Sequence, residues 1–229
     1  MNENLTQKIR LDFDRLALCD RDEWNHNNCY HQFLLKQLPE HNQTILDLGC
    51  GVGRFSRLLA EKSDRVIALD LSPKSIEIAQ QKSSELDNID YQIADISQWQ
   101  FPVNHFDAIT SIATVHHLSL SELLPKLQAA LKPGGVLLIL DLLEHQNIRD
   151  ILYDCIAVPL NWYFQRTKNR HVEFDPVAAE AMREHQKSDR YLTFSQAKAI
   201  YSKYLKTAKT NRHLFWRYSL IWHKPIGGI

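Results

Sequence analysis

Short apolar runs alternate with helix-type periodicity from Thr44 onward. Several runs lack the in/out alternation of half-exposed strands, which is typical of parallel strands buried on both faces. Ser72 followed by Pro73 supplies a hydroxyl cap and a proline at the first helical position, so a helix is expected to begin there. The expected strands cover residues 44–48, 66–69, 91–93, 108–112 and 136–140, and the expected helices cover residues 54–61, 73–86 and 121–131.

The two ends of the chain depart from this alternation. Residues 1–41 precede the first strand and are expected to be mostly helical, and residues 144–190 interrupt the pattern with helices near 148–164 and 176–186. The pattern then predicts a helix over 194–204 and a closing antiparallel hairpin from 206–212 and 214–223. The whole chain, residues 1–229, is therefore expected to be one α/β domain. It would have a doubly wound, mostly parallel seven-stranded sheet, an antiparallel C-terminal strand and a helical cap.

A glycine-rich turn follows the first expected strand, in the segment ILDLGCGVGRF over residues 45–55. Gly49, Gly51 and Gly53 let the backbone turn tightly and approach a ligand at the carboxyl end of the strand. Asp70 ends the next strand, 17 residues after Gly53, where a carboxylate can accept both hydroxyls of a ribose. The turn and the acid together predict a nucleoside site.

Asp47 bears on which nucleoside is bound. A carboxylate two residues before the first glycine would repel the pyrophosphate that a dinucleotide presents to a helix N-terminus. It suits a ligand that carries an ammonium and a sulfonium, and S-adenosylmethionine has both. Alternatively, Asp47 only orients the loop through hydrogen bonds.

These motifs, over roughly residues 40–142, resemble those of class I S-adenosylmethionine-dependent methyltransferases. The resemblance implies that the glycine turn holds the methionine part of the cofactor, that Asp70 binds ribose and that the segment around Asp95 recognises adenine. Asp95 may instead only cap a helix, an alternative that the sequence leaves open, and Cys50 is expected to act as a backbone position. The implied cofactor-binding set is Asp47, Gly49, Cys50, Gly51, Gly53, Asp70, Leu71, Asp95, Ile96 and Ser111.

The residues that would bind the methyl acceptor are marked by less specific motifs than those that would bind the cofactor. His116 and His117 follow the fourth strand, and an imidazole suits proton removal near neutral pH, with His117 preferred; both may equally be packing residues of the loop. His31 is the third catalytic candidate, and His185 and Asp189 are expected to help close the cap. Segments 24–31 and 144–170 are expected to meet over the strand ends and form the acceptor pocket. The expected substrate-binding residues are Tyr30, His31, Asp141 and Trp162.

Composition narrows the function classes. Lys+Arg 27 against Asp+Glu 27 gives a formal charge of +0, so no basic excess predicts a nucleic-acid partner. The four cysteines are scattered, the N-terminus has no signal-type apolar stretch, and the longest apolar run, 136–140, is too short for membrane insertion. A cytoplasmic protein is expected. No metal is expected, because His26 and His31 are badly spaced for one helix face and show no third ligand.

The sequence thus predicts an S-adenosylmethionine-dependent methyltransferase that acts on an oxygen, nitrogen or carbon atom of a small organic metabolite. Two alternatives stay open at this point. One is a methyltransferase acting on RNA or protein, and the other is a cofactor-binding regulator without catalysis. The acceptor, the need for a general base and the oligomeric state do not follow from the residues.

Overall fold

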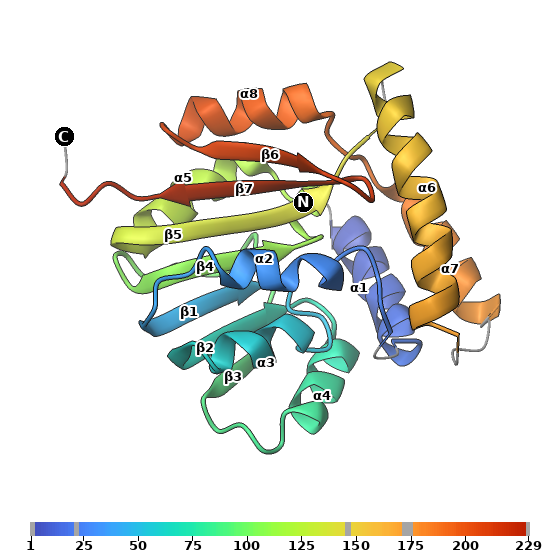
Figure 1. The fold of residues 1–229 in the computed structure, drawn as a ribbon. Coiled ribbons are helices and arrows are strands. Elements are labelled where there is room, and N and C mark those ends of the chain that lie inside the picture. The colour runs from blue at the N-terminus through green and yellow to red at the C-terminus, as the bar shows by residue number, and fades with distance from the viewer. Residues whose placement is uncertain (1–2, 21–22, 145–147, 171–175, 228–229) are drawn as a thin grey trace.

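The structure is a computed structural model that describes residues 3–20, 23–144, 148–170 and 176–227. Its centre is one seven-stranded sheet in the order β3-β2-β1-β4-β5-β7-β6 (Figure 1). Five strands run parallel, and β7 pairs antiparallel with both β5 and β6. The strands are β1 (Asn42–Leu48), β2 (Ser63–Asp70), β3 (Ile89–Ile93), β4 (Phe106–Ile112), β5 (Leu131–Leu142), β6 (Lys209–His213) and β7 (Arg217–His223).

Helices follow the strands in the alternation that the apolar pattern predicts. Ser72 caps α4 through its hydroxyl, which accepts from the Ser75 amide at 2.9 Å, with Pro73 at the first helical position. The helices are α1 (Glu3–Leu18), α2 (His31–Leu35), α3 (Arg54–Ala60), α4 (Pro73–Lys82), α5 (Leu120–Ala130), α6 (Ile148–Lys168), α7 (Pro176–Ser188) and α8 (Phe194–Tyr204). Two 3₁₀ turns, η1 (Asn28–Tyr30) and η2 (Val115–His117), lie in the connections.

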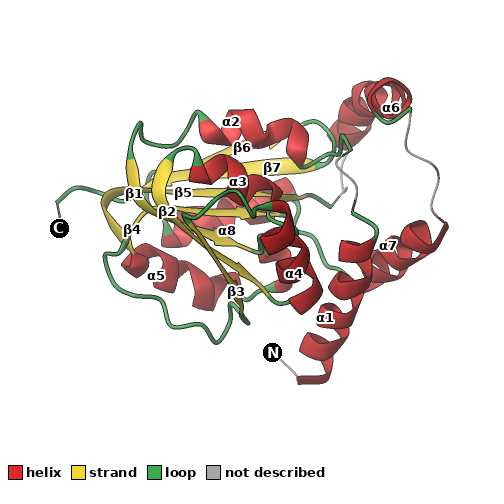
Figure 2. Cartoon of the chain, turned by 90° about the horizontal axis from the view of Figure 1, so that it is seen from below, coloured by secondary structure: helices red, strands yellow, loops and turns green. Residues whose placement is uncertain are grey.

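The central strands are covered on both faces (Figure 2). On one face, α5 and α8 enclose Leu124 and Tyr201 with the sheet, and on the other face α2 and α3 enclose Leu34 and Leu59. All four side chains are at most 1% exposed. Burial on both faces explains why these strands read as continuous apolar runs.

The closing hairpin differs from the sequence prediction in its bounds. The second strand begins at Arg217 rather than at residue 214, because Phe215 and Trp216 have φ of 57° and 59° and form the turn. Arg217 stands opposite Leu142 at the carboxyl end of β5. The turn therefore delivers a basic residue to the end of the sheet where the glycine turn lies.

Three helices gather at that end, where the parallel strands finish. Figure 1 shows α1, α6 and α7 there, and α1 packs against both α4 and α7. The expected cap segments 1–41 and 144–190 include residues 1–2, 21–22, 145–147 and 171–175, which lie outside the described residues. Their described parts meet as expected: the Asn169 side chain accepts from the Trp24 amide at 2.9 Å.

Candidate functional site

The glycine turn between β1 and α3 packs closely against the loop that follows β4. Gly49 has φ of +70°, and a Cβ there would lie 2.1 Å from Thr114 Oγ1, so only glycine fits against the loop after β4. The amides of Gly49 and Cys50 donate to the Leu69 carbonyl at 2.8 and 3.0 Å. The turn is thereby fixed between the ends of β2 and β4.

Two buried carboxylates hold this turn and face the space above it. Asp70 accepts from the Gly51 amide at 2.8 Å and from the Ser72 amide at 2.9 Å. Asp47 accepts from the hydroxyls of Ser56 at 2.6 Å and Thr110 at 2.9 Å. Burial raises the pKa of Asp47 to about 6, and burial also raises the pKa of Asp70. Neither acid has a cationic partner among the described residues, so a cationic ligand would find two ready counter-charges.

Both acids line a cavity of about 710 Å³ at the carboxyl ends of the strands. This size falls in the range of small-molecule sites, about 300–1,000 Å³. The cavity includes most of the residues predicted for the cofactor, and α1 covers it with Phe13 and Ala17. The predicted residues that line it are His31, Asp47, Gly49, Cys50, Gly51, Asp70, Leu71, Asp95, Ile96, His116 and His117.

Two predicted cofactor residues stand outside this lining. Gly53 begins α3 in the left-handed conformation, and a Cβ there would meet Tyr91 Oη at 2.3 Å, so its role is helix packing. Ser111 is 1% exposed, and its hydroxyl donates to the Leu48 carbonyl at 3.2 Å inside the sheet. Asp95 lines the cavity and also closes its own turn, accepting from the Ser97 amide at 2.8 Å.

Cys50 also follows the expectation of a backbone position. Burial, with Asp70 and Asp47 nearby, raises the pKa of the Cys50 thiol well above its usual value. The thiol donates to the Gly51 carbonyl at 3.6 Å. A thiol held neutral is a poor nucleophile, so the cavity offers Cys50 as a wall residue.

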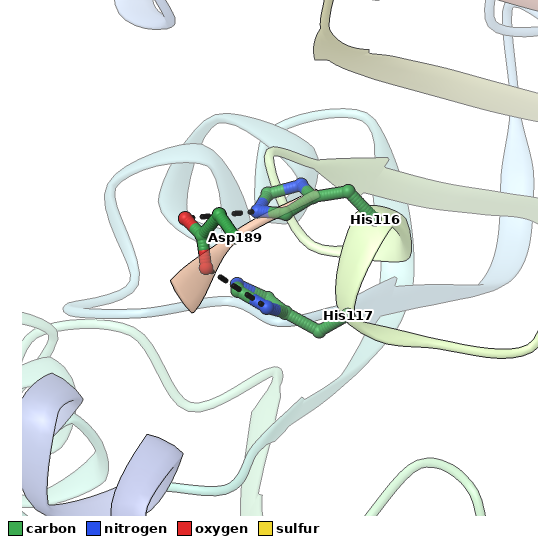
Figure 3. Close-up of side chains that lie close together, drawn as sticks. All are labelled: His116, His117 and Asp189. Atoms are coloured by element: carbon green, nitrogen blue, oxygen red, sulfur yellow. Dashed lines mark ion pairs between the residues drawn. The ribbon is translucent and has the colours of Figure 1, made fainter. Parts of the chain in front are cut away.

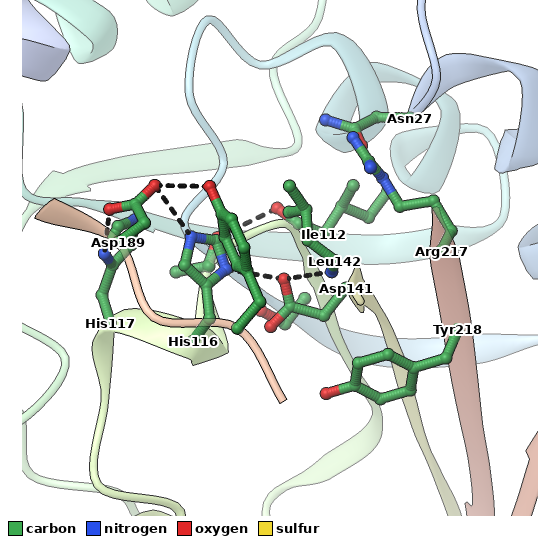
Figure 4. Close-up of polar contacts among 12 residues, drawn as sticks. Asn27, Ile112, His116, His117, Asp141, Leu142, Asp189, Arg217 and Tyr218 are labelled. Carbon is green, nitrogen blue, oxygen red and sulfur yellow. Dashed lines mark hydrogen bonds and ion pairs between the residues drawn. The ribbon is translucent and has the colours of Figure 1, made fainter. Parts of the chain in front are cut away.

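At the other end of the cavity, His116 and His117 of η2 meet Asp189, which follows α7 (Figure 3). His116 Nε2 lies 3.8 Å from Asp189 Oδ2, and His117 Nδ1 lies 3.6 Å from Asp189 Oδ1. On its other side, His116 Nδ1 lies 2.7 Å from Asp141 Oδ1, so its ring stands between two carboxylates (Figure 4). Asp141 is 1% exposed and does not line the cavity, which makes it a positioning residue for His116 rather than the predicted substrate contact.

The protonation state of these histidines follows from burial. Burial, followed by the neighbouring His116, lowers the pKa of His117 to about 4, while Asp189 opposes this shift. Burial and the nearby Arg54 lower the pKa of His31 to about 4. Both imidazoles are therefore neutral at pH 7 and can accept a hydrogen bond or bind a metal.

Two predicted substrate residues point elsewhere. Trp162 on α6 is 67% exposed and lies under Arg166, 5.9 Å from the guanidinium carbon to the ring centroid. Its helix does reach the cavity, but through Gln165. Gln165 is also exposed, but it is among the cavity-lining residues and Trp162 is not. The Tyr30 hydroxyl donates to the Leu214 carbonyl at 2.8 Å and anchors the N-terminal segment to the hairpin turn.

The structure adds Arg217, which the strand pattern alone did not single out. It lines the cavity, is 7% exposed, and donates from Nε to Asn27 Oδ1 at 2.8 Å. Burial lowers its pKa, and within the described residues no carboxylate lies within salt-bridge distance of its guanidinium. An arginine at the start of a mostly apolar strand was the one signal in the sequence.

No helix in the described ranges is both long enough and apolar enough to cross a membrane.

Met182 of α7 and Gln165 of α6 line the cavity, so each of these two helices contributes at least one residue to its wall.

Comparisons with known proteins agree with this geometry. A family model described as "Methyltransferase domain" matches residues 45–135. Phosphoethanolamine N-methyltransferase 1 of Arabidopsis thaliana is 34% identical over 113 residues, which are 48% of this chain and 23% of that protein. Ubiquinone biosynthesis O-methyltransferase of Coxiella burnetii is 30% identical over 128 residues, 55% of this chain and 54% of that protein. The chain thus matches between about a quarter and about a half of these relatives' lengths.

Among solved structures, geranyl diphosphate C-methyltransferase of Streptomyces coelicolor A3(2), in complex with Mg²⁺, geranyl diphosphate and S-adenosyl-L-homocysteine, superposes with a TM-score of 0.64. The alignment covers 96% of this chain and 97% of that one at 11% identity. At this identity the likeness shows a shared fold and nothing about function. The strand order, the glycine turn with its strand-end acid, and the match over residues 45–135 agree with one another. Residues 45–135 of the chain therefore match a methyltransferase domain, and the chain has the fold of the solved methyltransferase named above.

Proposed function

We propose that this protein binds S-adenosylmethionine and transfers its methyl group to an oxygen, nitrogen or carbon atom of a small organic molecule. The observation that carries the proposal is one continuous cavity. It is lined by the acids Asp47 and Asp70 at one end and by His116 and His117 at the other. A cofactor held at the first end leaves room for an acceptor at the second.

The residues at the cofactor end fit this ligand. Asp70 uses one lone pair on each oxygen for a backbone amide, which leaves acceptor capacity for ribose hydroxyls. Asp47 places a carboxylate beside the turn that would hold the methionine part, where an ammonium is stabilised. Leu71 and Ile96 offer apolar walls for adenine. When bound, the cofactor supplies an electrophilic methyl group, so no side-chain nucleophile is needed.

At the acceptor end, we propose that His116 and His117 contact the group that is methylated. Asp141 orients His116 through Nδ1 and leaves Nε2 facing Asp189, on the cavity side. An imidazole nitrogen at this place can accept the proton of a hydroxyl or ammonium acceptor as the methyl group is transferred. His31 also lines the cavity, and we propose it as a further contact. Arg217 adds a buried positive charge that favours an acceptor bearing an anionic group.

Segments 1–41 and 144–190 are proposed to form the cap over this site, within a single domain. Phe13 of α1 packs edge-on against the rings of His117 and His185, with centroids 5.5 and 4.8 Å apart. Such contacts exclude water from the end of the cavity where the acceptor would lie.

A small-molecule acceptor is favoured over RNA or protein because apolar side chains of α1, such as Phe13 and Ala17, line the cavity and the net charge is +0. The relatives named above are, by their titles, enzymes of small substrates. We keep the cytoplasm as the proposed compartment, and no nucleic-acid partner is proposed.

The test has two stages. Calorimetry with S-adenosylmethionine, S-adenosylhomocysteine and NAD should give binding of the two sulfur nucleosides and none of NAD. A turnover screen against a metabolite library, read as a mass increase of one methyl group, then identifies the acceptor. Binding without any turnover across acceptor classes would favour the non-catalytic regulator instead.

A further inference from the structure

The cluster of His116, His117 and Asp189 has spacings that hydrogen bonds do not explain. The histidine nitrogens lie 3.8 and 3.6 Å from the two oxygens of Asp189. An N–H···O hydrogen bond is about 2.7–3.2 Å long, so these groups point at one another without bonding directly. Their ligand atoms nevertheless all lie within 4.8 Å of one another.

Those separations are close to the ones that a bound metal ion requires. With zinc–nitrogen and zinc–oxygen bonds of about 2.0–2.2 Å, the ligand atoms of a tetrahedral site stand about 3.4 Å apart. The observed 3.6 and 3.8 Å run to different oxygens of Asp189, and the ligand atoms as a set lie within 4.8 Å of one another, so metal binding requires the three side chains to move closer to the ion. Two imidazoles and one carboxylate are a ligand set that zinc, iron and other divalent transition metals accept.

Two of the three prospective ligands, His116 and Asp189, are already oriented by contacts with other side chains. Asp141 Oδ1 lies 2.7 Å from His116 Nδ1, which fixes the tautomer that leaves Nε2 free to bind. The Tyr191 hydroxyl donates to Asp189 Oδ2 at 2.7 Å. Metal-binding histidines and carboxylates are commonly held by such outer contacts.

His117 supplies an independent observation. Its side chain is 10% exposed, and Nε2 is buried with no hydrogen-bond partner in the described parts of the chain. Its Nδ1 has only the 3.6 Å approach to Asp189. A buried polar ring that lacks a protein partner is costly, and a ligand at the cluster would relieve that cost.

We propose that His116, His117 and Asp189 bind one divalent transition-metal ion of the zinc type at the acceptor end of the cavity. Three protein ligands leave a fourth coordination position, as in catalytic rather than structural zinc sites, and His185 Nε2 lies beside the cluster, 3.5 Å from Asp189 Oδ2. His26 and His31, on which the expectation of no metal rested, are not part of this set. The ligands come from segments far apart in the sequence, so their spacing along the chain held no metal signal.

The fourth coordination position of the metal ion indicates which methyl acceptors the site suits. This inference about the acceptor rests on the proposed function. A metal-bound hydroxyl or thiol loses its proton more readily, because the ion stabilises the anion. Among the acceptors of the proposed function, those with an oxygen atom are therefore favoured. The same imidazole nitrogens cannot hold a metal and accept a proton, so the metal-loaded protein would not use these histidines as bases.

The experiment is a Zn²⁺ titration of the full chain after chelator treatment, without cofactor, followed by calorimetry. Co²⁺ is used as a second probe, because its visible absorption reports coordination by nitrogen and oxygen ligands. One equivalent should bind. Affinity should fall more than about 100-fold in Asp189→Asn and His117→Gln, and about 10- to 100-fold in Asp141→Asn, which removes only an outer contact.

His41→Gln is the matched control, since His41 lies at the start of β1 with its side chain 73% exposed, 3.5 Å from Asp64. It should bind Zn²⁺ like the unaltered protein. The proposal is overturned if the unaltered chain binds no Zn²⁺, or if His41→Gln weakens binding as much as His117→Gln does. Circular dichroism of each variant separates lost binding from lost folding. Cofactor binding, measured separately, tests the proposed function and does not depend on this result.

Discussion

The pKa of Asp47 makes cofactor binding depend on pH. In the free protein this carboxyl has a pKa of about 6, because burial outweighs the hydrogen bonds from Ser56 and Thr110. Only the ionised form attracts the ammonium of the cofactor's methionine part. The ionised fraction is about 0.97 at pH 7.5 and about 0.09 at pH 5, so the dissociation constant should rise about ten-fold between these values.

Calorimetry across pH 5–7.5 measures this, and Asp47→Asn is the informative variant. The amide is nearly the same size as the carboxyl group and cannot ionise. The variant should therefore bind the cofactor more weakly at pH 7.5, and its affinity should lack the pH dependence that ionisation of Asp47 causes. Adenosine, which lacks the cationic part, should bind the unaltered protein with little change over the same range. Equal pH slopes for the unaltered protein and Asp47→Asn would refute the assignment of the cation to Asp47.

The same carboxyl should affect the stability of the free protein in the opposite sense. Its folded pKa lies above the ordinary value of 3.8, so the folded state holds the proton more tightly. The resulting stability is present below about pH 4 and is lost as pH rises through about 6, by about 3 kcal/mol in all. Asp47→Asn should therefore unfold at a higher urea concentration than the unaltered protein at pH 7.5. At pH 4 this difference in urea concentration should disappear.

Four further variants test the site. Asp70→Ala should weaken cofactor binding by about 1–3 kcal/mol in calorimetry, because both the ribose contact and the Gly51 amide lose an acceptor. Gly49→Ala should destabilise the fold in urea unfolding by about 1–3 kcal/mol, because its Cβ would collide with Thr114 at positive φ. Once an acceptor is known, Gln165→Ala should raise its KM, whereas Trp162→Ala should change neither KM nor cofactor affinity; the reverse pattern would contradict the observed orientation of α6.

The sequence by itself determined the sheet and the cofactor end of the site. Parallel strands buried on both faces leave continuous apolar runs, and α8 was predicted with its observed bounds, Phe194–Tyr204. The turn at Gly49 and the acid at Asp70 were also visible, because a tight turn beside a strand end needs those residue types locally. Each of these features depends on neighbours a few residues away in the chain.

Only the tertiary structure decided the acceptor end. Which residue of α6 reaches the cavity, Gln165 rather than Trp162, depends on contacts such as that between His26 and Asn161, 135 residues apart. Asp189 meets His116 and His117 across more than 70 residues of chain, and Arg217 reaches the cavity because a turn ends where β7 pairs with β5. Periodicity along a chain reports which face of an element is apolar, but not which distant side chain will face it.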